Sequence, residues 1–221
     1  MDKRTLAKYL DFANHHQDAT LEQIKELCSL VRKHGFHSAF VNPYYLKEAK
    51  EYLDGKATLG TVVSFPLGQE TKDIKLLSVI EAVNKGADEL DVSMNVGLFK
   101  ARKYDECFQE MKAIVDMAKM RKTKVLVKFI IETGLLTDKE IQKASLLVLK
   151  SGADFIKTCS GMGPRGASLK DVDLIKRAVK DKIMIKVAGG VDTLEEAMGF
   201  IKKGVDRIGT SQAVKIINEC S

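Results

Sequence analysis

The sequence predicts a (β/α)8 barrel, and three observations support this. Helix-type and strand-type patterns alternate along the chain, seven runs are clearly strand-like and an eighth is weaker, and the helix-to-strand junction recurs as Gly-x-Asp at Gly86, Gly152 and Gly204. A flavodoxin-like or Rossmann sheet is the alternative, but it usually has fewer strands, and no G-x-G-x-x-G follows the first one. With 221 residues, we expect one catalytic barrel over residues 1–221.

The expected strands are short apolar or β-branched runs between turn residues. In chain order they are a weaker run at 10–15, followed by 36–41, 57–64, 87–92, 124–131, 154–159, 183–188 and 206–210.

Six helices are expected between these runs, and several have clear start and stop signals. Capping boxes predict helices that open at Thr20, Thr137 and Thr193 and close at Gly35, Gly152 and Gly204, respectively. The others are expected at 71–85, at 104–121 and from Ser168 onward.

Composition and charge indicate a soluble globular protein. The formal net charge is +6, with no basic tail or aromatic-interleaved basic stripe of the kind that binds nucleic acid. No apolar run approaches the ~20 residues that cross a bilayer, and no secretory signal follows the first residues. The four cysteines lack C-x-x-C spacing, and the histidine pairs lack helical i, i+4 spacing. We therefore expect a cytoplasmic protein without a metal site and without nucleic-acid or membrane partners.

Two lysines, Lys157 and Lys186, lie toward the ends of two successive strand-like runs. An ammonium group is costly to bury unless it is paired or loses its proton. If the two residues are level on neighbouring strands, they lie roughly 5 Å apart, and each lowers the pKa of the other. An amine with a pKa near neutrality can attack a carbonyl and form a Schiff base, so the pair predicts aldolase chemistry.

Strand parity places further charges inside the barrel. Leu90 and Val92 share the outward parity, which directs Glu89 and Asp91 inward, and Lys128 has the inward parity on its own strand. A buried Glu89–Lys128 ion pair without a catalytic part is the favoured interpretation for those two residues. It is less convincing for Lys157 and Lys186, because lysines outnumber their local partners and both lie at C-terminal strand ends, where barrel active sites are found.

Glycine and hydroxyl residues accompany the last two strands. Gly189 and Gly190 follow the seventh strand, and Gly209, Thr210 and Ser211 follow the eighth. The loops after these strands often bind phosphate through backbone N–H groups. Glycine pairs are also common in ordinary tight turns, but together with the lysines they predict a phosphorylated aldehyde or ketone substrate.

Seven segments in the expected order resemble the active-site segments of deoxyribose-phosphate aldolases, and the resemblance extends over essentially the whole chain. They are residues 42–45, 65–68, 86–91, 131–136, 155–158, 186–190 and 207–211.

The resemblance implies a class I lyase that cleaves 2-deoxyribose 5-phosphate to glyceraldehyde 3-phosphate and acetaldehyde without metal or organic cofactor. It implies that Lys157 is the Schiff-base lysine, that Lys186 lowers its pKa, and that Asp91 is an acid/base group acting through an ordered water. Members often form dimers, so a homodimer is compatible with it. The implied phosphate-binding and supporting residues are Gly161, Gly189, Gly190, Gly209, Thr210 and Ser211, with Asp11, Glu89 and Lys128.

Several positions depart from the family pattern. Phe12 and Ala13 stand where histidine and threonine are usual, Phe40 replaces a common cysteine, and Gln212 replaces a serine of the phosphate loop. Arg165 has two interpretations, as a cation for the phosphate or as a cap on a surface loop.

Because Asp91, Lys157 and Lys186 are intact, we expect deoxyribose-phosphate aldolase activity to be retained. A Schiff-base aldolase of altered substrate range and a non-catalytic barrel that binds a phosphorylated metabolite remain open. A third hypothesis is an isomerase that uses Asp91 and Glu89 as bases with no covalent step. Borohydride trapping separates the imine hypotheses from the others.

Overall fold

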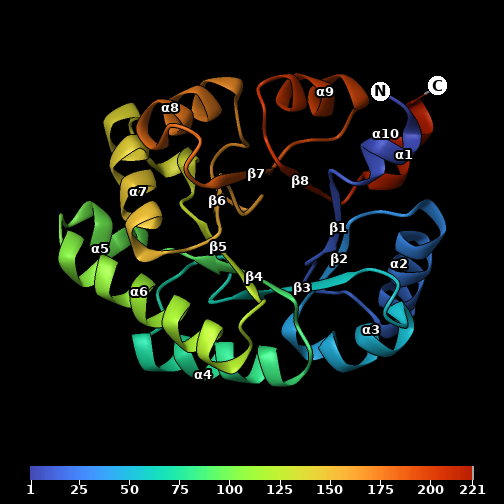
Figure 1. Ribbon diagram of the computed structural model, residues 1–221, viewed down its shortest axis with the longest axis horizontal. Coiled ribbons are helices and arrows are strands. Elements are labelled where there is room, and N and C mark those ends of the chain that lie inside the picture. The colour runs from blue at the N-terminus through green and yellow to red at the C-terminus, as the bar shows by residue number, and fades with distance from the viewer. Residues whose placement is uncertain (221) are drawn as a thin grey trace.

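Eight parallel strands close into a barrel in the computed structural model, which describes residues 1–220 (Figure 1). Neighbours along the chain are neighbours in the sheet, and β1 pairs with β8 to close it. The (β/α)8 prediction is therefore confirmed, and an open flavodoxin-like or Rossmann sheet is excluded. The expected domain ended at Ser221, which lies outside the described residues.

All eight expected strands are present, including the weaker first one. They are β1 (Leu10–Asn14), β2 (Ser38–Val41), β3 (Thr58–Val63), β4 (Glu89–Ser93), β5 (Leu126–Ile130), β6 (Phe155–Lys157), β7 (Met184–Ala188) and β8 (Arg207–Thr210). Most begin one or two residues later than predicted, because the first residues of each expected run still belong to the preceding turn.

The repeated Gly-x-Asp junction has a structural cause. In each copy the glycine has a positive φ, of 99°, 82° and 76° in chain order. The carboxylate of the aspartate that follows accepts a hydrogen bond from a backbone N–H of the preceding strand. The pairs are Asp88 with Leu59 at 3.0 Å, Asp154 with Val127 at 2.8 Å, and Asp206 with Ile185 at 2.8 Å. The same glycine turn and aspartate hydrogen bond thus precede three of the eight strands.

The helices surround the barrel (Figure 1). The six predicted ones are α2 (Leu21–His34), α4 (Lys72–Asn84), α6 (Tyr104–Arg121), α7 (Asp138–Ser151), α8 (Leu169–Val179) and α9 (Leu194–Lys202). The others were not predicted, because they are shorter than the window in which a helical period can be recognised. They are α1 (Lys3–Ala7), α3 (Leu46–Leu53), α5 (Val96–Lys100) and α10 (Ala213–Glu219), with the 3-10 turns η1 (Pro43–Tyr45) and η2 (Thr133–Leu135).

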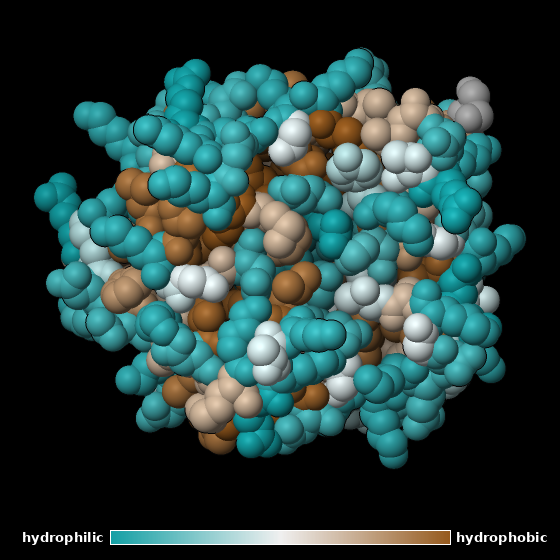
Figure 2. Space-filling model, viewed as in Figure 1, coloured by the Kyte–Doolittle hydropathy of each residue, from teal (hydrophilic) through white to brown (hydrophobic). Residues whose placement is uncertain are grey.

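The main hydrophobic core lies between the strands and the helix ring. Outward-facing strand residues such as Leu90, Val127 and Ile208 are fully buried there. Figure 2 shows a largely hydrophilic rim with hydrophobic side chains gathered inward of it. Within residues 1–220, no helix combines the length and apolar character needed to cross a membrane. The barrel interior is instead rich in buried charge, and this is where a site is expected.

Candidate active site

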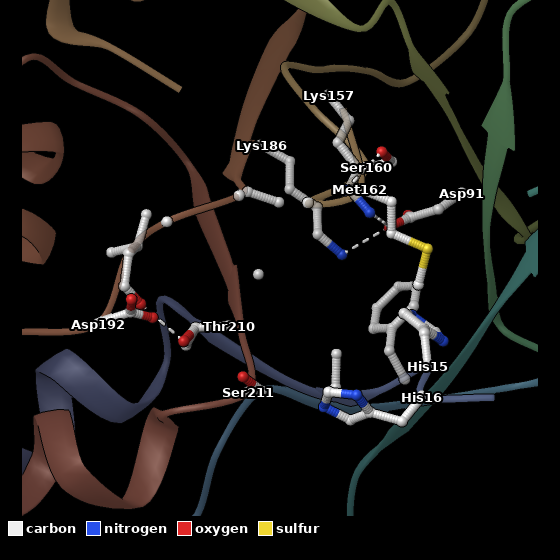
Figure 3. Close-up of a pocket in the computed structure, with 18 residues that line it drawn as sticks. His15, His16, Asp91, Lys157, Ser160, Met162, Lys186, Asp192, Thr210 and Ser211 are labelled. Atoms are coloured by element: carbon white, nitrogen blue, oxygen red, sulfur yellow. Dashed lines mark hydrogen bonds and ion pairs between the residues drawn. The ribbon is translucent and has the colours of Figure 1, made fainter. Parts of the chain in front are cut away.

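A cavity of about 190 Å³ opens at the C-terminal ends of the strands. Its lining brings together Lys157, Lys186 and Asp91 with every residue that was expected to bind phosphate, namely Gly161, Gly189, Gly190, Gly209, Thr210 and Ser211. The three expected supporting residues do not line it: Asp11, Glu89 and Lys128 are buried in the barrel interior, where they form ion pairs. The side chains that line the cavity are drawn in Figure 3.

The two lysines are direct neighbours across β6 and β7, as their strand positions predicted. Lys157 pairs in register with Lys186, and both side chains are buried. They converge on one acceptor, because Lys157 Nζ donates to Asp91 Oδ2 at 2.8 Å and Lys186 Nζ donates to the same oxygen at 2.9 Å (Figure 3). One carboxylate oxygen therefore serves two ammonium groups.

Their surroundings make the two lysines unequal. Burial lowers the pKa of Lys157, and the Lys186 ammonium lowers it further against the opposing effect of Asp91. Burial also disfavours the Lys186 cation, but the carboxylates of Asp11 and Asp91 outweigh burial and raise the pKa of Lys186. Asp11 is the cause of the difference, because its Oδ2 lies 2.8 Å from Lys186 Nζ. The expectation that each lysine lowers the pKa of the other must be corrected, since the net shift is downward only for Lys157.

Asp91 is held as an anion. Burial opposes ionisation, but Lys157, Lys186 and Lys128 together keep the pKa of Asp91 well below its usual range. Its second oxygen, Oδ1, lies 3.4 Å from Lys128 Nζ and accepts no hydrogen bond within the described part of the chain. The carboxylate is thus a fixed negative charge with one acceptor atom left for another group.

A second charged layer involves Glu89 and Lys128. Lys128 Nζ is in direct contact with Glu89 Oε2, and this confirms the predicted buried ion pair. Two residues that sequence reasoning missed extend the layer: His37 Nε2 lies 3.1 Å from Glu89 Oε1 and 2.8 Å from Arg207 Nη2. His37 had been considered only for its spacing to another histidine, and Arg207 only as part of a matching segment.

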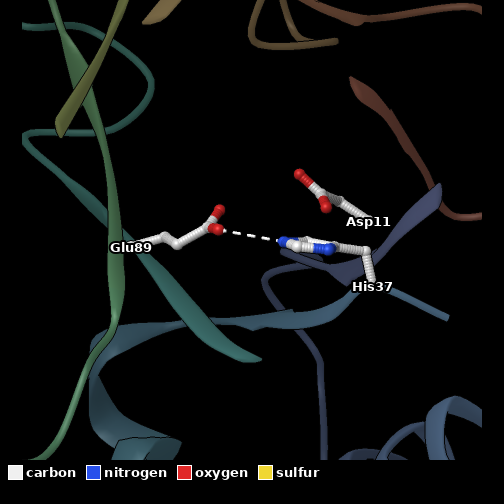
Figure 4. Close-up of side chains that lie close together, drawn as sticks. All are labelled: Asp11, His37 and Glu89. Atoms are coloured by element: carbon white, nitrogen blue, oxygen red, sulfur yellow. Dashed lines mark hydrogen bonds and ion pairs between the residues drawn. The ribbon is translucent and has the colours of Figure 1, made fainter. Parts of the chain in front are cut away.

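Asp11, His37 and Glu89 offer ligand atoms within 4.8 Å of one another, as a metal site would (Figure 4). Their anionic oxygens are already used, however, because Asp11 Oδ2 pairs with Lys186 and Glu89 pairs with Lys128. A divalent cation would add positive charge to a position already bordered by these ammonium groups. We therefore describe the cluster as paired ions.

The backbone is tightly packed at two glycines that line the cavity, Gly189 after β7 and Gly209, which the structure places within β8 and not after it. Gly189 has φ +93°, and a Cβ there would come within 3.1 Å of the Cys159 Cβ, while a Cβ on Gly209 would lie 2.9 Å from Lys186 Cε. The Thr210 hydroxyl, at the end of β8, is engaged by the loop after β7, since it donates to Val191 O at 2.7 Å. Figure 3 shows Thr210 and Ser211 across the cavity from Asp91.

The loop after β1 contributes His15, a lining residue that the sequence did not identify. Its ring packs 5.2 Å from the Phe65 ring and 6.4 Å from the Phe40 ring, measured between centroids. Burial, reinforced by the Lys157 cation, lowers the pKa of His15 to about 3. In the sequence, His15 stood out only as part of the adjacent His15–His16 pair, which was considered for a metal site and not for the cavity.

Arg165 is not a lining residue of the cavity. Its guanidinium forms a bidentate ion pair with the Asp171 carboxylate, at 2.6 and 2.9 Å, and donates a hydrogen bond to Thr133 O at 3.0 Å. It thus fastens the loop after β6 to the start of α8. Of the two interpretations, these contacts support the loop cap.

Comparisons with known proteins agree with this geometry. The sequence model of the DeoC/LacD family aldolases matches residues 1–211. The chain is 42% identical to a deoxyribose-phosphate aldolase from Caldicellulosiruptor saccharolyticus, over 99% of this chain and 100% of that one. It is 40% identical to a deoxyribose-phosphate aldolase from Thermococcus kodakarensis, over 98% of this chain and 97% of that one.

Solved structures give the same result. The aldolase QR15 superimposes with a TM-score of 0.91 at 37% identity, covering 97% of this chain and 95% of the other. A tetrameric deoxyribose phosphate aldolase from Aeropyrum pernix superimposes with a TM-score of 0.91 at 28% identity, covering 98% and 91%. The family match spans the residues that form the barrel and its cavity, and the chain belongs to the DeoC/LacD aldolase family.

Proposed function

We propose that this protein is a class I aldolase that cleaves 2-deoxy-D-ribose 5-phosphate to D-glyceraldehyde 3-phosphate and acetaldehyde through a Schiff base on Lys157. The observation that carries the proposal is the unequal lysine pair that lines the cavity, in which the pKa of Lys157 is lowered beside Lys186, whose pKa is raised. The names of the relatives support the substrate.

The substrate enters as the open-chain sugar, with its aldehyde at Lys157 and its phosphate toward the glycine-rich loops after β7 and β8. Neutral Lys157 attacks the aldehyde carbon C1, and the resulting carbinolamine takes up one proton from solvent and loses a water molecule to give a protonated imine. The positive charge that forms is close to Asp91, whose Oδ2 already lies 2.8 Å from the Lys157 nitrogen. Lys186 remains a cation, and its charge favours the neutral form of the Lys157 amine for the next turnover.

The carbon–carbon bond then breaks toward the imine. The C3 hydroxyl gives its proton to an ordered water that Asp91 orients, and the electron pair of the C2–C3 bond moves to the iminium nitrogen. Glyceraldehyde 3-phosphate leaves, and an enamine remains on Lys157. Protonation at C2 and addition of one water release acetaldehyde and restore the amine. Asp91 is suited to relaying protons rather than to keeping one, because its neighbours hold its pKa low.

Two of the three alternative hypotheses differ in their structural support. A shifted substrate range is favoured by the aromatic side chains Phe40 and Phe65 beside the lysines, with His15 packed against both rings. A non-catalytic phosphate-binding barrel has no comparable support, since it gives no reason to bury two lysines that share one carboxylate oxygen.

We further propose that the chain acts as one barrel unit in the cytoplasm and assembles as a homodimer. The relative from A. pernix is described as a tetramer, and exposed Leu67, Leu77 and Met120 offer apolar surface. Light scattering coupled to gel filtration measures the assembly, and a monomeric mass at micromolar concentration contradicts the dimer.

Borohydride trapping tests the function. The protein is mixed with 2-deoxyribose 5-phosphate and sodium borohydride, and the adduct is mapped by mass spectrometry. We expect a stable mass gain on Lys157 that is absent in Lys157→Met and unchanged in the exposed-helix control Lys150→Met. An adduct confined to Lys186 would overturn the assignment. Thermal stabilisation by the substrate with no adduct at any pH would indicate the non-catalytic alternative. Trapping by other phosphorylated aldehydes alone would indicate a shifted substrate range.

A further inference from the structure

The aromatic ring of Phe40 makes an unusually close contact with a lysine of the active site. Phe40 lies on β2 inside the barrel and is fully buried. Lys186 Nζ lies 3.5 Å from its ring centroid, and Lys128 Nζ lies 4.8 Å from it. An ammonium over a buried aromatic face is attracted by the negative potential of the ring.

The neighbouring strands leave room for this ring and fix its place. The two residues level with Phe40 in the sheet are Ala13 on β1 and Gly60 on β3, both small. A Cβ on Gly60 would lie 2.2 Å from Phe40 Cζ, so the ring occupies the space that any larger residue there would need. A large residue between two small ones is thus a matched set across three strands.

The ring completes the surroundings of Lys186. An ammonium group has three N–H donors. Two of the contacts of Lys186 are to carboxylates, Asp11 Oδ2 at 2.8 Å and Asp91 Oδ2 at 2.9 Å, and the Phe40 face is the third.

We propose that Phe40 is a positioning residue for Lys186, and that its ring face holds the ammonium between Asp11 and Asp91 so that Asp91 is shared with Lys157. This inference rests on the proposed Schiff-base function and deepens it. Without the ring, Lys186 can withdraw toward Asp11. Asp91 then pairs with Lys157 alone, which stabilises the Lys157 cation and leaves less free amine at neutral pH.

Other charges also face this pair, and the strands supply all but one of them. They are Asp11 from β1, Glu89 and Asp91 from β4, Lys128 from β5, Arg207 from β8, and the imidazole of His15 after β1. None of them changes when only the potential of the Phe40 ring is altered. The experiment must therefore change that potential and leave the shape of the ring in place.

Fluorinated phenylalanines do this, because fluorine weakens the negative face of the ring with little change in size. We would incorporate mono-, di- and trifluorophenylalanine at position 40. The rate of borohydride trapping of Lys157 by 2-deoxyribose 5-phosphate is then followed from pH 5 to 10, with acetaldehyde as a second probe. The same series at Phe99, a buried residue of α5 outside the barrel interior, is the matched control.

We expect the pH midpoint of trapping to rise with each fluorine, by about half to one pH unit for the trifluoro ring. Below the midpoint, this corresponds to roughly three- to tenfold slower trapping. The Phe99 series should leave the midpoint unchanged. Slower trapping at an unchanged midpoint would overturn the proposal, because that pattern indicates a steric role only. No trapping in the unsubstituted protein at any pH would instead mean that the proposed function fails.

A second pair of variants tests the packing. Gly60→Ala should displace the ring and raise the midpoint in the native background. In a Phe40→Leu background, where the ring is already absent, the same substitution should cause no further shift. Equal shifts in the two backgrounds would show that Gly60 acts independently of Phe40 and would contradict the proposal. Thermal melting of each variant checks that it is folded.

Discussion

Two charged layers inside the same barrel differ in how their ions are matched. Around Glu89, one carboxylate meets one ammonium, that of Lys128, with His37 at its second oxygen. Around Asp91, a single oxygen accepts from both Lys157 and Lys186. Both carboxylates lie on β4 and both face lysines, so the number of ammonium groups at each carboxylate oxygen makes the difference.

This number determines what each layer can do. A matched buried pair offsets its desolvation cost and holds its protons, and it therefore contributes to a defined structure. Where two ammonium groups share one carboxylate oxygen, the amine with fewer carboxylate contacts gives up its proton most readily. Asp11 decides which amine this is, because it contacts Lys186 and no ion pair joins it to Lys157.

The largest effect is expected from Lys157→Met. Removing the nucleophile should lower turnover by at least about 10³-fold, because no other group in the site forms the imine. The free energy of unfolding should stay level or rise, since Asp91 keeps its ion pairs with Lys186 and Lys128. Steady-state kinetics and urea unfolding measure the two quantities. A large loss of stability would show that the ion pairs around Asp91 are structural as well.

The next largest effect is expected from Lys128→Met. It leaves Glu89 buried with only His37 beside it, and the free energy of unfolding should fall by about 3–5 kcal/mol. Adding Glu89→Gln removes the unpaired charge and should recover much of the loss, as chemical unfolding of both variants can measure. If Lys128→Met is as stable as the native protein, the contrast between the two layers is wrong.

Much of this arrangement could be predicted from the sequence, and the reasons are local. Strand parity placed Glu89, Asp91 and Lys128 inside, because the side-chain period of a strand is two and depends on nothing else. The level position of Lys157 and Lys186 followed from successive strands of similar length.

What sequence reasoning missed depends on distances between elements far apart in the chain. The unequal pKa values of the lysines arise from Asp11, a residue 175 positions before Lys186, and no spacing rule connects the two. Phe40 was recognised as a replacement for a common cysteine, but its position over Lys186 depends on Gly60 being its neighbour. His15 and Arg207 reach their sites through side-chain directions that a sequence pattern does not contain.

A smaller effect, which sharpens the comparison, concerns His15 beside the ion pairs around Asp91. In the unfolded chain a histidine has a pKa of about 6.5, whereas burial lowers the pKa of folded His15 to about 3. Between these values the unfolded state binds a proton that the folded state does not, so stability falls as pH decreases, by up to about 1.4 kcal/mol per pH unit.

The His15→Asn variant should therefore lose part of the slope of unfolding free energy against pH between pH 6 and 4. The matched control is His16→Asn at the exposed neighbour, which should keep the native slope. Urea unfolding at half-unit pH steps gives both slopes. An unchanged slope in His15→Asn would mean that the imidazole is protonated in the folded state, despite its burial beside Lys157.

The smallest effect on catalysis is expected outside both layers, at Arg165. Its guanidinium already binds Asp171 and Thr133. Arg165→Met should therefore change KM for the phosphorylated substrate by less than about twofold, a free-energy difference no larger than the thermal energy. The backbone amides of residues 159–167 should exchange faster, because the loop loses its link to α8. Asp171→Asn removes the other half of that link and should give the same exchange pattern. If Arg165→Met raises KM tenfold while Asp171→Asn does not, the arginine contacts the phosphate directly, and positive charge for the substrate comes from the loop after β6 as well as from Lys157 and Lys186.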